Sequence, residues 1–154
     1  MLNVKPFKQK SGFCGPASLK MVLNYYGINK TEKELIKLSG ATKSKGVGPK
    51  GILKAAKKLG FKGFCKDFSS LAEIRKYTIK KKIPIIVDWF SKDEGHYSVV
   101  IGIEKENIYL QDPSLGFRRA MKLSTFKRVW FDFPGPFIKS KNDIIIRRMI
   151  VIYK

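Results

Sequence analysis

One thiol, one imidazole and one carboxyl occupy positions in this chain where they could act together as a nucleophilic catalyst. Cys14 lies before Gly15 and Pro16 at the expected start of a helix, where free backbone N–H groups and the helix dipole favour a thiolate. His96 is the only histidine, so it is the only imidazole available as a general base. Asp112 ends an apolar segment and can orient that imidazole. The set predicts acyl chemistry through a thioester.

Each of these residues also has an ordinary structural interpretation. A free cysteine is often a small buried hydrophobic residue, a lone histidine is more often structural, and an aspartate at a strand end is often solvated. Gln9 lies five positions before Cys14 and could supply an oxyanion donor beside the Cys14 backbone N–H. Gln9 on its own does not indicate a catalytic site. The four residues together, each at the end of an expected element, indicate a catalytic site.

The elements that must position these residues begin with helices in the first half of the chain. Apolar residues at helical spacing follow Pro16 and stop at Gly27, which predicts a helix opening at Cys14. Capping boxes, Thr31 with Glu34 and Ser70 with Glu73, predict two more helix starts. A further helix is expected over 52–59, after a glycine-rich loop at 44–51.

Short apolar runs replace this pattern from residue 83 onward. They predict strands at 83–87, 96–103, 108–112, 117–123 and 144–153. The polar residues 104–107 suggest an antiparallel turn whose outer strand ends meet, which brings Asp112 beside His96. Helices followed by an antiparallel sheet predict an α+β fold, and 154 residues predict a single domain over 1–154.

The charge of the chain is strongly positive. It carries 32 Lys and Arg against 12 Asp and Glu, a formal net charge of +20, and 26 of the 32 are lysines. Such a charge attracts nucleic acid. Proteins that bind phosphates and bases specifically rely more on arginine, however, and these lysines are spread along the chain. We expect a solvated basic surface, with a nucleic-acid-binding protein as an alternative.

Other features narrow the protein class. No apolar run of 18 residues or secretory h-region is visible, and two cysteines make no disulfide framework, so a cytoplasmic protein is expected. Two Cys and one His without close spacing predict no metal site, and no cofactor is indicated. Cys65 is expected in the core or in a strand. The aromatic residues Trp130, Phe131 and Phe133 line either a cleft or the core.

Three segments carry a resemblance to a known family. The helix at 14–27 with Gln9 before it, the histidine segment at 95–103 and the Asp-Pro segment at 108–116 resemble papain-like peptidases of the bacteriocin-processing, double-glycine type. The resemblance implies a papain-like fold, Cys14 as nucleophile, His96 as base, Asp112 as orienting group, and Gln9 with the Cys14 amide as oxyanion donors. It also implies a peptide or protein substrate cut after Gly-Gly, and no metal.

Two departures from that family qualify the resemblance. No membrane-spanning or ATP-binding segment is visible, so a stand-alone member is expected. Five positions separate Gln9 from Cys14 where the family more often has six, which moves the amide by about 3 Å in an extended chain. The loop compensates, or the oxyanion hole is poorly formed. A non-hydrolytic peptide-binding module and an acyl-transfer enzyme therefore stay as alternatives.

Overall fold

The computed structural model describes residues 1–154. Its helical segments are α1 (Cys14–Tyr25), α2 (Glu32–Ser39), α3 (Pro49–Lys58), α4 (Leu71–Arg75), the π-helical turn η1 (Lys76–Lys80), α5 (Leu123–Val129) and the 3₁₀ turn η2 (Lys141–Asp143). Its strands are β1 (Lys62–Lys66), β2 (Ile85–Ser91), β3 (Glu94–Ile103), β4 (Asn107–Asp112), β5 (Phe117–Lys122), β6 (Phe131–Asp132), β7 (Ile145–Ile146) and β8 (Arg148–Tyr153).

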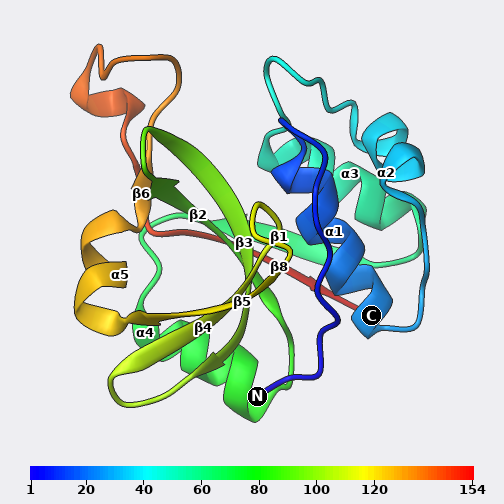
Figure 1. The fold of residues 1–154 in the computed structure, drawn as a ribbon, viewed down its shortest axis with the longest axis horizontal. Coiled ribbons are helices and arrows are strands. Elements are labelled where there is room, and N and C mark those ends of the chain that lie inside the picture. The colour runs from blue at the N-terminus through cyan, green and yellow to red at the C-terminus, as the bar shows by residue number, and fades with distance from the viewer.

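A six-stranded antiparallel sheet separates two hydrophobic cores. Its strand order is β1-β8-β2-β3-β4-β5, and β6 pairs with β7 apart from it. Helices α1, α2 and α3 cover one face, while α4 and α5 lie against the other (Figure 1). The alternation of side chains along a strand supplies both cores: in β3, Val99 packs toward α1 and Val100 toward α5. The α+β class is therefore confirmed.

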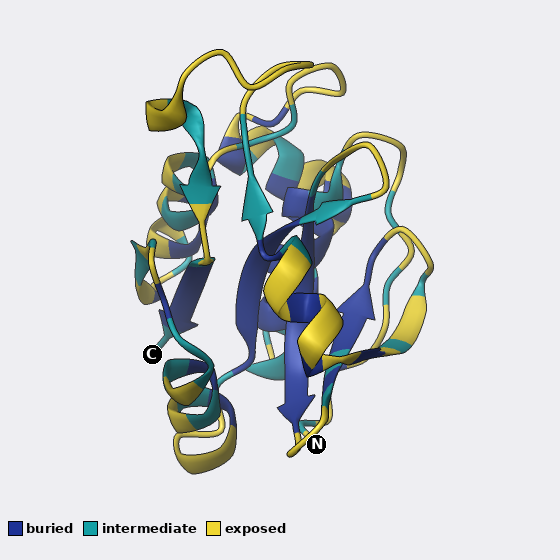
Figure 2. Ribbon diagram, turned by 90° about the vertical axis from the view of Figure 1, so that its left-hand side faces the viewer, coloured by how far each residue is buried: buried dark blue, intermediate teal, exposed yellow.

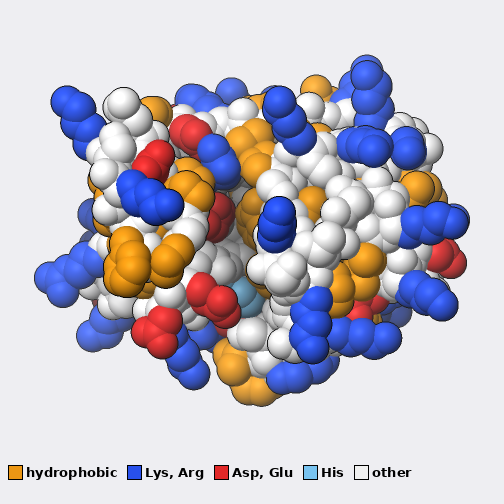
Figure 3. Space-filling view, turned by 90° about the horizontal axis from the view of Figure 1, so that it is seen from above, with side chains coloured by type: hydrophobic (Ala, Val, Ile, Leu, Met, Phe, Trp, Pro, Cys, Tyr) orange, Lys and Arg blue, Asp and Glu red, His pale blue; other side chains and the backbone are white.

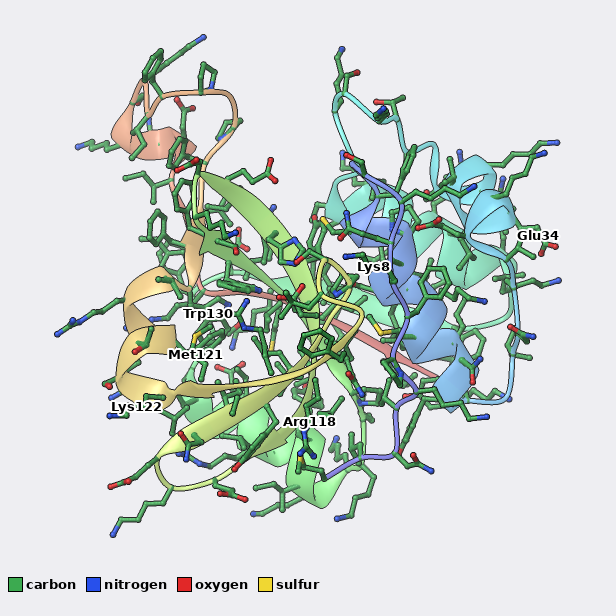
Figure 4. All side chains as sticks on the ribbon, in the orientation of Figure 1. Lys8, Glu34, Arg118, Met121, Lys122 and Trp130 are labelled. Atoms are coloured by element: carbon green, nitrogen blue, oxygen red, sulfur yellow. The ribbon has the colours of Figure 1, made fainter.

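Burial is concentrated in the middle strands of this sheet. Figure 2 shows β2, β3, β4 and β8 largely buried, with the connecting loops and the outer faces of the helices exposed. Trp130 and Met121, labelled in Figure 4, belong to the core between α5 and the sheet. A rigid, buried β3 is what holds His96 in a fixed position.

The N-cap residues predicted from sequence cap their helices. Thr31 Oγ1 accepts the Glu34 N–H at 3.1 Å, and Ser70 Oγ accepts the Glu73 N–H at 3.1 Å. Gly40, the expected stop of the second helix, is left-handed with φ of 75°. These contacts satisfy backbone donors that a helix start otherwise leaves unpaired. Local sequence therefore sets the limits of α2 and the start of α4.

Several sequence predictions of element limits are wrong. The expected 144–153 strand is two strands, because Arg147 adopts a left-handed conformation with φ of 51° between β7 and β8. The third helix starts at Pro49 rather than Ile52, since proline suits the first helical position. Strand β2 runs over 85–91 instead of 83–87. None of the helices has the length and apolar composition needed to cross a bilayer.

Strand β1 and helix α5 are among the elements that the sequence did not predict. Strand β1 carries lysine at both ends and forms only because β8 pairs with it, from Lys62 opposite Tyr153 to Lys66 opposite Met149. It contains Cys65, which agrees with the strand interpretation of that residue and lies half-buried against the first core. Helix α5 has seven residues and is held by burial of Leu123 and Phe126. Both elements depend on tertiary contacts.

Candidate active site

Cys14 is the first residue of α1, and the backbone before it makes a sharp turn. Gly12 has φ of 86°, and a side chain there would strike the Lys43 carbonyl. Phe13 occupies the N-cap position, so no side chain caps this helix and its first turn has no acidic residue. The half-buried Cys14 thiol accepts the Tyr97 N–H at 3.5 Å. The first N–H groups of α1 thus stay available beside the sulfur.

His96 lies on β3 and is buried, with 7% of its surface exposed. Its Nε2 lies 2.6 Å from Asp112 Oδ1, which leaves Nδ1 for the thiol. Burial lowers the pKa of His96, but hydrogen bonds with Asp112 and Cys14 and their negative charges outweigh burial and raise it to about 9. The protonated imidazole is therefore stabilised between an acid and a sulfur.

Asp112 ends β4 and is 1% exposed. Its Oδ1 also accepts the N–H and the hydroxyl of Ser114, and Oδ2 accepts a hydrogen bond from Arg119 at 3.0 Å. Burial raises the pKa of Asp112, but the hydrogen bond and charge of His96, with the bonds from Ser114, hold it well below its ordinary value. The antiparallel pairing of β3 and β4 that the sequence predicted brings this ionised carboxyl to His96.

Gln9 lies in the segment before α1, beside the turn that follows Asp112. Its backbone N–H donates to the Pro113 carbonyl at 2.9 Å, and the neighbouring Lys8 ammonium donates to the Ser114 carbonyl (Figure 4). The Gln9 side chain donates from Nε2 to the Lys10 carbonyl at 3.2 Å, and its buried Oε1 has no partner. The backbone is thus fixed near the site while the amide is engaged locally.

A cleft of about 530 Å³ opens beside the thiol and the imidazole. One wall is the loop 45–49, with Val47 packed on Gly15, and the other is formed by β6 and the segment around η2. Figure 3 shows this hollow from above, with His96 at its base. His96 also lines a second hollow of about 470 Å³, with Ser114, Leu115 and Arg119. His96 therefore borders two hollows, of which the first also borders the thiol.

The aromatic residues assigned to cleft or core divide between the two. Trp130 is core, with 2% of its surface exposed and its Nε1 bonded to the Arg148 carbonyl. Phe133 lines the cleft, and its ring stacks on Phe90 at 5.2 Å between centroids. Phe131 stacks on the other side of Phe90. Only the end of this aromatic segment therefore borders the site.

Three acidic residues of the cleft, Asp88, Asp132 and Asp143, were missed by the sequence analysis. Asp88 on β2 is 4% exposed, and burial, the charge of Asp132 and a hydrogen bond to its carboxyl raise the pKa of Asp88 to about 9. Asp88 interrupts the apolar run of β2, and a buried charge within a strand is a signal that could have identified it. The sequence offers no comparable signal for Asp132, because this residue reaches the cleft only when the folded chain places β6 beside β2 and β3.

The matches to known proteins agree with this geometry. The model of the Peptidase C39 family matches residues 6–133, so the chain belongs to that family. An uncharacterized protein of Methanothermobacter thermautotrophicus is 33% identical over 123 residues, 80% of each chain. The lactococcin-G-processing and transport ATP-binding protein LagD of Lactococcus lactis is 32% identical over 144 residues, 90% of this chain but 20% of its own length.

Solved structures show the same fold. The peptidase domain of Streptococcus ComA, a bifunctional ABC transporter of a quorum-sensing pathway, has a TM-score of 0.77 and 25% identity, covering 98% of both chains. A double-glycine-motif protease from an AMS/PCAT transporter, crystallised with a leader peptide, has a TM-score of 0.73 and 21% identity, covering 99% of this chain and 92% of its own. The resemblance read from the sequence to double-glycine peptidase domains is thus confirmed.

Proposed function

We propose that this chain is a cysteine peptidase in which Cys14 attacks the substrate carbonyl, His96 transfers protons and Asp112 orients the imidazole. The observation that carries the proposal is the buried hydrogen bond between His96 and Asp112, 2.6 Å long, with Cys14 close enough to raise the pKa of the same imidazole. This is the arrangement in which an imidazole activates a thiol and its tautomer is fixed by a carboxylate. Membership of a peptidase family supports it.

The reaction follows from these roles. The Cys14 thiolate adds to the carbonyl carbon, and the His96 imidazolium then gives its proton to the departing amine as the C–N bond breaks. Water, deprotonated by His96, next attacks the thioester and releases the acid and the thiol. Acyl transfer replaces this water by a second amine, so both outcomes share the first half of the reaction.

The oxyanion would be held by the Cys14 N–H and the Gln9 amide. The uncapped start of α1 supports the first donor, because no side chain competes for its N–H groups. The second donor requires Gln9 Nε2 to leave the Lys10 carbonyl, a single bond of 3.2 Å at the surface. That local bond is also the observation that favours a non-hydrolytic peptide-binding module, in which the hole does not form.

The substrate we propose is a leader-type peptide cut after Gly-Gly. The relatives that support this are a lactococcin-processing transporter and a double-glycine protease crystallised with a leader peptide. The two hollows that His96 borders leave room for a peptide beside the proposed catalytic residues.

The proposal is tested first on the thiol and then on turnover. We expect iodoacetamide to alkylate Cys14 rapidly well below pH 8.5 in a Cys65→Ser background, and His96→Ala to abolish this reactivity. Cys14→Ala should abolish cleavage of an internally quenched Gly-Gly peptide without changing the circular dichroism spectrum. Ordinary thiol reactivity unaffected by His96 would refute the peptidase and favour the binding module, as would cleavage that survives Cys14→Ala.

A further inference from the structure

Acidic residues are concentrated at the cleft of an otherwise basic protein. The chain has only 12 Asp and Glu, and three of them, Asp88, Asp132 and Asp143, line the cleft beside Cys14. Seen from above, acidic side chains border the hollow around His96, and lysines and arginines occupy the outer surface (Figure 3). This distribution opposes the overall charge of +20, so the cleft has an electrostatic character of its own.

Asp88 is a buried acid without a cationic partner. On the sheet it lies between Tyr97 of β3 and Arg148 of β8, its two cross-strand neighbours. Arg148 does not pair with it, because its Nε and Nη2 bind the carboxylate of Asp67 at 2.7 and 2.9 Å. The Asp88 carboxyl faces the negative charge of Asp132 instead, and burial and this charge raise the pKa of Asp88. Asp88 therefore keeps its proton, and one negative charge remains beside it.

Asp132 fixes this acidic pair beside the proposed catalytic residues. Its carboxylate lies against Gly95, the residue before His96, and occupies the space that a side chain at position 95 would need. Its Oδ1 accepts the Phe133 N–H at 2.7 Å, which holds the carboxylate at the cleft wall. Asp143 on η2 lines the same cleft and is half-buried. The three acids therefore border the path of any peptide attacked by Cys14.

We propose that Asp88, Asp132 and Asp143 form a subsite that binds a lysine or arginine side chain of the peptide substrate, next to the bond attacked by Cys14. This inference rests on the proposed peptidase function and adds a substrate preference to it. A substrate cation pairs with the negative charge beside Asp88, through charge-assisted hydrogen bonds. The ring of Phe133, stacked on Phe90, offers an apolar wall for the aliphatic stem of such a side chain.

The neighbouring charges leave this subsite negative. Arg148 is paired with Asp67 and the His96 imidazole with Asp112, and the remaining cation that lines the cleft is Lys45, exposed on the loop of the opposite wall. The carboxylates also do not form a group that could hold a metal ion. A set of separated acids beside an aromatic wall suits an extended organic cation with an apolar stem.

A first experiment measures the electrostatic field at the thiol without requiring turnover. In a Cys65→Ser background, Cys14 is modified with two methanethiosulfonates, the cationic trimethylammonioethyl reagent and the anionic sulfonatoethyl reagent. The ratio of the cationic to the anionic modification rate at Cys14 is compared with the same ratio for 2-mercaptoethanol, a free thiol. We expect the ratio at Cys14 to exceed that of the free thiol by about tenfold, the factor given by about 1.4 kcal/mol of local attraction. A ratio equal to or below that of the free thiol would overturn the subsite.

Variants locate the source of that field. Asp132→Asn and Asp143→Asn should each lower the rate ratio several-fold, whereas Asp88→Asn replaces a protonated carboxyl by a neutral amide and should change the ratio little. Glu34→Gln is the matched control, since it removes one acidic charge on α2, at the outer side of the helix layer in Figure 4, and should leave the ratio unchanged. An equal effect of Glu34→Gln would assign the ratio to net charge and overturn the proposal.

A second experiment reads the preference in turnover. Quenched peptides with one Gly-Gly site carry Lys, Met or Glu at each flanking position in turn. At one position we expect Lys to be preferred over Glu at least tenfold in kcat/KM, and the Asp132→Asn variant to lose most of that preference. Equal cleavage of all three peptides would overturn the subsite and leave the peptidase standing. Absence of cleavage with the thiol rate ratio retained would refute the peptidase alone.

Discussion

Asp112 and Asp88 are two buried aspartates of one cleft with opposite surroundings. Asp112 receives hydrogen bonds from His96, Ser114 and Arg119, and its pKa is held well below the ordinary range. Asp88 is removed from water and faces the carboxyl of Asp132, which raises its pKa to about 9. Burial acts in the same direction on both groups, so the donors decide which of them is ionised.

The difference assigns different tasks to chemically identical side chains. An ionised Asp112 can fix and stabilise an imidazolium, because its oxygens are already paired with cations and N–H groups. Asp88 and Asp132, which lack a cationic partner, can accept one from outside the protein. We therefore propose that Asp112 acts in the reaction and that Asp88 contributes to substrate selection.

The largest expected effect that separates the two residues is on catalysis. Asp112→Asn should lower kcat by about 10⁴-fold, because an amide no longer holds the productive imidazole tautomer. Asp88→Asn should lower kcat/KM only about tenfold, and on the Lys-containing peptide. Initial rates on the two quenched peptides test this. Losses of equal size in the two variants would remove the distinction between the roles.

The second largest expected difference between Asp112 and Asp88 is in the free energy of unfolding. Asp112→Asn leaves one of the buried donors around that carboxyl without an acceptor, which should lower the free energy of unfolding by about 3 kcal/mol. Asp88→Asn replaces a carboxyl that already holds a proton by an amide of the same shape, so the free energy should stay the same or rise. Urea unfolding at pH 7 measures both. Destabilisation by Asp88→Asn beyond that of Asp112→Asn would contradict the assigned ionisation states.

The pH dependence of stability gives a sharper test of Asp88. Its pKa of about 9 in the folded protein lies above about 3.9 in the unfolded chain, so the folded state keeps a proton that the unfolded state releases. Stability should therefore fall as pH rises from about 4 to 9. His96, with a folded pKa of about 9 against about 6.5 unfolded, loses its contribution only above pH 6.5.

The window from pH 4.5 to 6.5 thus isolates Asp88 from His96. Across it the wild-type free energy of unfolding should fall by at least about 1 kcal/mol more than that of Asp88→Asn, measured by urea titration at both pH values. Asp112→Asn is the contrasting variant, since a depressed pKa contributes stability that is lost only as pH falls below about 4. Parallel curves for wild type and Asp88→Asn would show that Asp88 is ionised in the fold.

The smallest effect concerns the outer partner of Asp112. Arg119 binds Oδ2 at 3.0 Å, is 35% exposed and lies over the Trp89 ring, and the bond from His96 uses the other oxygen. Arg119→Gln should therefore reduce kcat/KM only about two- to fivefold, the range of a partly exposed ion pair. Arg118→Gln on the same strand is the matched control (Figure 4). A loss as large as that of Asp112→Asn would make Arg119 essential to the orientation of Asp112.

Local sequence determined much of this molecule. Pro16 after Cys14 and the capping residues Thr31 and Ser70 set helix starts through contacts within one turn, and these starts agree with the structure. The polar turn at 104–107 fixed the antiparallel partner of β3, and with it the neighbour of His96. Such features are readable because their interactions span few residues.

Only the tertiary structure decided the rest. Strand β1 exists because β8 pairs with it across more than eighty residues, and Asp88 meets Asp132 because β6 lies against β2. The Gln9 side-chain amide likewise donates to the Lys10 carbonyl, and the spacing between Gln9 and Cys14 did not predict this bond. These outcomes depend on which distant surfaces exclude water together, and on the partners that each buried charge then finds.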